Sequence, residues 1–297
     1  MTRTTGEAGR VLKAALRRQF NLKKQVLSGK LKPDGLSDFI KEMAPIVTSI
    51  AAVLVSIFVY NISARQSRFI EADLRAKAIQ VLYTKDDAQR EIAAVTVAEY
   101  GLDMLPGLRA VLGASISDIR KGGILATTEM FSRASASEQE KILSKLLDYV
   151  EHGASYTVAG ATGVFAILAE RGQLTSHQFG RVLSCVEKYI NTIQDQTRLD
   201  KQEAMLGVVN LLHTITRDAR ERPNRIWAVK LLLTSAESSA DTSVRKNALD
   251  NLGPDQMKVP ELNLTPGERE DLVNRLRKLT LLYEVKTDAQ GALHNFE

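Results

Sequence analysis

Four histidines and one cysteine are the side chains best suited to metal or nucleophilic chemistry in this 297-residue sequence. A zinc site needs a ligand spacing such as H-E-x-x-H or several thiolates, and the sequence has neither. His152 precedes Gly153, a helix-ending position where a cation meets the helix dipole. His213 lies in the apolar stretch VVNLLHTI and is interpreted as a core residue. The sequence therefore predicts no metal site.

Three further motifs favour structure over catalysis. The segment from Gly160 to Gly163 lacks the glycine-lysine-serine/threonine ending of a phosphate loop, so it predicts close helix packing. Cys185, in the apolar pattern LSCVEKYI, is expected to be a buried thiol. The acidic cluster that starts at Glu268 belongs to a first helical turn, where carboxylates suit the helix dipole. We predict no catalytic residues and no cofactor; an enzyme whose site escapes motifs is the minor alternative.

Residues 43–64 form a run of 22 residues without a charged side chain. A helix rises about 1.5 Å per residue, so this run would span about 33 Å, enough to cross a bilayer core. The sequence predicts a single transmembrane helix, against the alternative of a core helix in a large bundle. Small residues recur every four positions on one face, which favours close helix approach in lipid. This predicted association face consists of Ala44, Thr48, Ala52 and Ser56.

The basic character of the chain is concentrated in residues 1–42, which hold ten Lys or Arg and four Asp or Glu. A short basic tail tends to stay in the cytoplasm, so we expect the tail inside and the helical domain on the opposite side. Part of the tail has the pattern of a basic amphipathic helix that lies on an anionic bilayer surface. Its membrane-surface residues would be Arg17, Arg18, Lys23 and Lys24. A solvated or partner-bound helix is the equal alternative.

After the run the apolar residues recur at helical spacing, and strand-like alternation is absent. The predicted fold class is all-α, with a transmembrane helix followed by a helical domain over 65–285 and a flexible tail over 286–297. Capping residues and turns punctuate the domain. They predict helices near 64–83, 85–101, 106–112, 117–133, 137–153, 155–172, 176–196, 199–219, 223–237, 242–252 and 265–285.

Two segments share one pattern, in which an aspartate precedes an arginine and a small residue. Asp241, Arg245 and Ala248 follow it, and so do Asp86, Arg90 and Ala93. Arg120 stands at the centre of a third, partial match. The pattern resembles a HEAT repeat, loosely and without a fixed period, over residues 65–253. The resemblance implies an α-helical superhelix used as a binding scaffold; an irregular helical bundle is the alternative.

These observations predict a membrane-anchored scaffold or adaptor that binds partner proteins at the bilayer, with an oligomeric membrane effector or pore subunit as the alternative. The partners expected are proteins and the lipid bilayer, with a possible homo-oligomer and no nucleic acid, since the basic tail has a single aromatic residue. The candidate partner surface consists of Arg90, Arg120 and Arg245, although arginines of such repeats often bond the neighbouring turn. Trp227 is interpreted as a core anchor or as an exposed hot spot.

Overall fold

The computed structural model describes residues 17, 21, 24, 56–63, 65–66, 70–84, 86–193 and 201–297. The chain divides into two compact units, Met1–Glu71 and Ala72–Glu297. In the first unit the described residues are helical. The second unit is a helical-repeat domain.

The predicted membrane span requires a correction. No helix among the described residues is both long enough and apolar enough to cross a membrane. Residues 56–63 are the described part of the predicted span 43–64. The finding contradicts the single-pass localisation, and the pore alternative, which depends on that span, has no support among the described residues.

The second unit begins with helical residues 72–81 and continues in a long series of helices. These are α3 (Asp87–Glu99), α4 (Leu105–Leu112), α5 (Ser117–Arg133), α6 (Ala136–His152), α7 (Ser155–Glu170), α8 (Ser176–Ile193), α9 (Gln202–Asp218), α10 (Arg222–Ser238), α11 (Thr242–Asp250), α12 (Pro266–Leu279) and α13 (Lys286–Phe296). Short 3₁₀ turns lie at Gly101–Met104, Val259–Leu262 and Tyr283–Val285. The described residues contain no strand, which agrees with the predicted all-α class.

Helix starts follow the capping residues in the sequence. The Asp86 carboxylate accepts a hydrogen bond from the Gln89 amide at 3.1 Å and thereby caps α3. The Asp241 carboxylate accepts from the amides of Ser243 and Val244 at the start of α11. Ser135 and Thr265 begin α6 and α12 with capping boxes. Each cap satisfies amide groups that a helix leaves without an internal partner, so these starts could be predicted closely.

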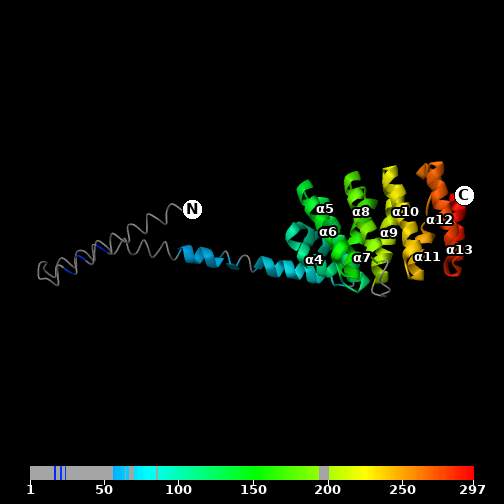
Figure 1. Ribbon diagram of the computed structural model, residues 1–297. Coiled ribbons are helices and arrows are strands. Elements are labelled where there is room, and N and C mark those ends of the chain that lie inside the picture. The colour runs from blue at the N-terminus through cyan, green and yellow to red at the C-terminus, as the bar shows by residue number, and fades with distance from the viewer. Residues whose placement is uncertain are drawn as a thin grey trace. The chain divides into compact units, whose positions relative to one another are not determined.

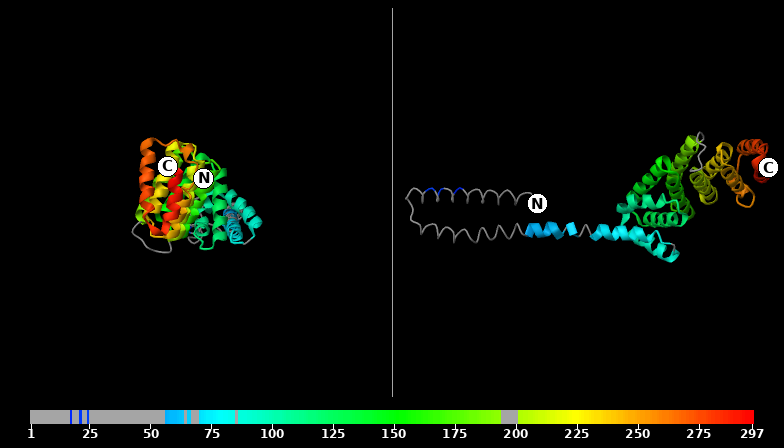
Figure 2. Two further views of the ribbon diagram at one scale, coloured as in Figure 1. Left: turned by 90° about the vertical axis from the view of Figure 1, so that its right-hand side faces the viewer. Right: turned by 90° about the horizontal axis from the view of Figure 1, so that it is seen from below.

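The helices form two layers. In one layer α3, α5, α7, α9, α11 and α13 pack each against the next, and in the other α6, α8, α10 and α12 do the same. Figure 1 shows α5, α8, α10 and α12 following one another in chain order, and the right-hand view of Figure 2 shows the same order of colours from green through yellow to red. The helices α6, α8, α10 and α12 start at residues 136, 176, 222 and 266, so the repeat length is about 40 to 46 residues. This spacing is typical of helical repeats of the HEAT and armadillo size.

Side-chain hydrogen bonds connect neighbouring repeats at this same spacing. Arg181 donates to Glu140, 41 residues earlier, and Gln202 donates to Ser243, 41 residues later. The Thr242 hydroxyl donates to Glu284, 42 residues later. The regular period is thus present in the contacts, although motif matching in the sequence did not find it.

Gly160 in α7 allows a close approach between two helices. A Cβ atom at this position would lie 2.5 Å from the Leu112 carbonyl oxygen of α4, which is well inside van der Waals contact. Gly207 allows the same close approach between α9 and α7, since a Cβ atom at this position would lie 3.0 Å from the Ala159 Cα. The prediction of close helix packing around residues 160–163 is therefore confirmed.

The C-terminal residues differ from the prediction of a flexible tail over 286–297. They form α13, in which Ala289, Ala292 and Phe296 are buried in the hydrophobic core. The Asn295 side-chain amide donates to the carbonyl oxygens of Leu252 and Met257, which fixes the helix against the preceding repeat. The segment mixes charged residues with a glycine and few large apolar residues, but its apolar residues fall on one face and are buried there.

Candidate docking surface

The three arginines predicted as a partner surface bond within the repeats. Arg120 donates from Nη1 to the Ala114 carbonyl oxygen at 3.0 Å, and Arg245 donates from Nε to the Ser239 carbonyl oxygen. Arg90 is only 2% exposed and donates to the Asp118 carbonyl oxygen. The carbonyl groups of Ala114 and Ser239 lie just before α5 and α11, and that of Asp118 lies in the first turn of α5. A partner-binding role for the three residues stays a prediction.

Arg120 makes two further contacts that cross the layer of odd-numbered helices. Its guanidinium lies 5.4 Å from the centre of the Tyr156 ring, at the start of α7. Its Nη2 atom bonds the Glu203 carboxylate in α9 at 3.0 Å. One side chain of α5 therefore reaches across α7 to α9, in a cation–π and ion-pair arrangement.

The other predicted site residues belong to the first unit. Arg17 and Lys24 are helical and exposed, whereas Arg18 and Lys23 lie outside the described residues. Ser56 is helical and exposed, and residues 44, 48 and 52 lie outside the described residues. The surface and association roles of these residues stay predictions from the sequence.

Cys185, His213 and Glu268 lie in surroundings that explain them as parts of the fold. The Cys185 thiol donates to the Leu147 carbonyl oxygen at 3.5 Å, and burial raises its pKa to about 11. Burial lowers the pKa of His213, whose Nδ1 atom is buried. The Glu268 carboxylate closes the capping box of α12, and the hydrogen bonds from Thr265 lower its pKa. Within the described ranges, no group of three or more His, Cys, Asp or Glu side chains is arranged to hold a metal ion.

Three grooves open on the surface of the described domain. One has a volume of about 480 Å³ and lies where α6, α7 and α8 meet; Glu151, His152, Ser155, Lys188 and Tyr189 contribute to its walls. A second, of about 270 Å³, lies beside the turn at Gly101. The third has a volume of about 310 Å³ and is lined by Arg222, Pro223, Ile226, Trp227, Lys230 and Glu268.

The third groove, which we call the Trp227 groove, lies between α10 and α12. Pro223, Trp227 and Lys230 are spaced by four and three residues, so they lie on one face of α10. The Trp227 ring is partly buried and packs against the core with its inner side. The ring therefore packs against the core, as the first interpretation expects, and also lines an open groove; a role as a binding hot spot stays a prediction.

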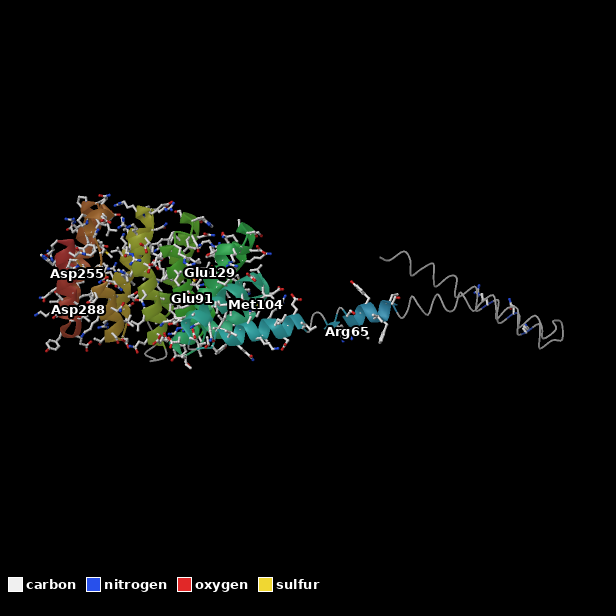
Figure 3. All side chains as sticks on the ribbon, turned by 180° about the vertical axis from the view of Figure 1, so that it is seen from behind. Arg65, Glu91, Met104, Glu129, Asp255 and Asp288 are labelled. Atoms are coloured by element: carbon white, nitrogen blue, oxygen red, sulfur yellow. The ribbon has the colours of Figure 1, made fainter. Side chains whose placement is uncertain are left out.

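The charges around the groove differ in how they are paired. Arg222 donates to the Glu268 carboxylate at 2.5 Å and, through Nε, to the carbonyl oxygens of Leu262 and Asn263. Arg275 bonds Glu237 at the other end of the same helix pair. Lys230 lies between these two ion pairs, and its ammonium group bonds no described residue. Figure 3 shows that nitrogen and oxygen atoms are interspersed over the surface of the domain.

Sequence reasoning noted Trp227 but did not recognise the groove. The spacing of Pro223, Trp227 and Lys230 is visible in the sequence and indicates one helix face. The opposite wall is formed by Glu268 of α12. It could not be predicted, because the sequence does not reveal which helix lies beside α10.

No protein-family model matches the chain, and no curated protein matches it. Among solved structures, an engineered protein is 16% identical, with a TM-score of 0.39 and coverage of 75% of this chain and 98% of that chain. A designed armadillo repeat protein in complex with the peptide (KR)4 is 17% identical, with a TM-score of 0.39 and coverage of 74% of this chain and 98% of that chain. The two-layer repeat architecture described above follows from the helix packing itself.

Proposed function

We propose that this chain is a non-catalytic helical-repeat scaffold that binds a partner protein, and that the Trp227 groove is one of its docking sites. The observation that supports this proposal most directly is an open aromatic ring beside an unpaired cation, in a groove between two repeats. Tryptophan and arginine are enriched among the residues that dominate binding energy at protein interfaces. Charged groups around such a centre add specificity and steer association.

The architecture supports the same conclusion. Stacked helix pairs present an extended surface in which each groove between repeats can take part of a partner. The ion pairs Arg222–Glu268 and Arg275–Glu237 hold the walls of the groove in place. A site whose walls are fixed before binding costs less ordering entropy when a partner binds.

The test is site-specific photo-crosslinking in the full chain. A photo-crosslinking amino acid is introduced in place of Lys230, and in a matched control in place of Lys145, an exposed residue of α6. We expect one protein to crosslink at position 230 and not at position 145. That protein, once purified, should bind the wild-type chain and should lose most of its affinity for Trp227→Ala.

Circular dichroism and thermal unfolding of Trp227→Ala establish that the variant is folded, because the ring also packs on the core. Lys230→Glu provides a second variant at a side chain that bonds no described residue. If positions 230 and 145 crosslink the same proteins equally, or if both groove variants bind the partner like the wild type, this proposal is wrong.

A further inference from the structure

We infer that the Trp227 groove selects an acidic peptide segment with an aliphatic side chain beside its carboxylates. This inference rests on the proposed function and specifies the chemistry of the partner at that site. It follows from the walls of the groove, from the pairing of its charges and from its size.

The apolar part of the groove is formed by Pro223, Ile226 and Trp227. Ile226 is 5% exposed and belongs to the floor, whereas Trp227 is partly exposed and Pro223 is exposed. The groove volume of about 310 Å³ is at the lower end of the range for ligand pockets, about 300 to 1,000 Å³. The apolar area therefore suits one or two aliphatic side chains of a peptide.

The single carboxylate of the groove is already engaged. Glu268 accepts hydrogen bonds from the Thr265 amide and hydroxyl, both at 2.9 Å, and from Arg222. All three bonds go to Oε2, and the charge of the carboxylate is balanced by Arg222. A basic ligand would have to share this one carboxylate with Arg222, because no other acidic residue lines the groove.

Three charged residues line the groove, namely Arg222, Lys230 and Glu268, and together they have a net charge of +1. Arg222 is neutralised by Glu268, so the excess charge is at Lys230. Lys230 lies one helical turn after Trp227 on α10, and the residue is partly buried. A carboxylate that follows the aliphatic residue of a bound peptide would form an ion pair there in a partly shielded environment, where such pairs are stronger than at an open surface.

The chain contains a single tryptophan, and this residue lines the groove, so its fluorescence reports occupancy directly. The probes are three synthetic twelve-residue peptides without aromatic residues. The first has two leucines flanked by glutamates, the second replaces the glutamates with lysines, and the third replaces the leucines with serines. We expect the first peptide alone to change the tryptophan emission in a saturable way, and we expect raised salt to weaken its binding.

Two charge-reversal variants control this titration. Lys230→Glu should weaken binding of the first peptide about tenfold, since it removes one surface ion pair and introduces a repulsion of similar size. Lys145→Glu makes the same change in net charge on α6 and should leave the binding constant unchanged. Equal binding of the lysine peptide, no saturable change with the glutamate-leucine peptide, or equal effects of the two variants would each overturn the inference.

The outcome separates this inference from the proposed function. If crosslinking at position 230 identifies a groove-dependent partner while the glutamate-leucine peptide fails to bind, the docking site stands and the acidic class is wrong. If the peptide binds at Trp227 with the expected charge dependence, the class is supported whichever protein the crosslinking identifies.

Discussion

Arg120 and Arg245 occupy equivalent positions in two helices of the same layer. Each is the fourth residue of its helix, α5 and α11, and each donates to a main-chain carbonyl oxygen six residues earlier, in Ala114 and Ser239. The arginine thus fastens the preceding turn to the helix that follows it. The agreement between two distant repeats indicates that this contact belongs to the repeat architecture.

The two arginines should differ in their contribution to stability. Arg120→Ala removes the carbonyl bond, the Glu203 ion pair and the Tyr156 contact, and we expect a loss of about 2–3 kcal/mol. Arg245→Ala removes the carbonyl bond, and we expect a loss of about 1–1.5 kcal/mol. Urea unfolding followed by circular dichroism measures both losses. An equal loss for the two variants would show that the contacts across α7 add nothing.

Gly160 should tolerate no side chain. Gly160→Ala places a methyl group against the main chain of Leu112, and we expect a destabilisation of about 1–3 kcal/mol because the backbone must shift. Gly291→Ala is the matched control in α13, since no atom lies within 4 Å of its Cβ position. There we expect a gain of about 0.5–1 kcal/mol from helix propensity. Thermal unfolding of the two variants should give shifts of opposite sign.

The cap of α11 should make stability depend on pH. The Ser243 hydroxyl, followed by the amides of Val244 and Ser243, lowers the pKa of Asp241 below its ordinary value of 3.8, against the effect of burial. The contribution of a carboxylate with a lowered pKa is present above the unfolded value and is lost as the pH falls through the folded value. Asp241→Ala should therefore cost about 1 kcal/mol at pH 7 and progressively less below pH 4.

The control for this pH series is Asp255→Ala, which removes an exposed carboxylate (labelled in Figure 3) from the turn after α11. Its unfolding midpoint should match that of the wild type at pH 7. A constant difference between Asp241→Ala and the wild type from pH 7 to pH 2.5 would contradict the assigned role of the Asp241 carboxylate.

Cys185 should react slowly with thiol reagents in the folded chain. Because burial raises its pKa from 9.0 to about 11, the thiolate fraction at pH 8 falls about 100-fold relative to an exposed thiol. The rate of reaction with Ellman's reagent at pH 8 should therefore rise at least about 100-fold when urea unfolds the protein. Equal rates in the folded and unfolded chain would show that the thiol is accessible.

Helix positions were largely predictable because local chemistry determines them. The capping residues Asp86, Asp241 and Thr265 start helices within two residues of the expected positions. The missed helix α13 has three buried residues, Ala289, Ala292 and Phe296, and its stability comes from contacts with a distant part of the chain. Tertiary packing of this kind is absent from a local pattern.

The arrangement of the helices and the Trp227 groove were less predictable. The repeat period is defined by contacts such as Arg181–Glu140 and Thr242–Glu284, whose residues differ in type from one repeat to the next. The groove combines a face of α10 with Glu268 of α12. The apolar run 43–64 predicted a membrane span from composition alone, and the described helices do not provide one.

The contact between Arg120 and Glu203 has a mechanical consequence. These residues are 83 positions apart, about twice the 41 positions between Arg181 and Glu140, so the ion pair spans two repeats where most contacts span one. A stack joined only through adjacent units can flex at every junction. The Arg120–Glu203 ion pair joins α5 to α9 across α7 and resists the separation of these helices. The part of the stack from α5 to α9 should therefore be stiffer than the remainder.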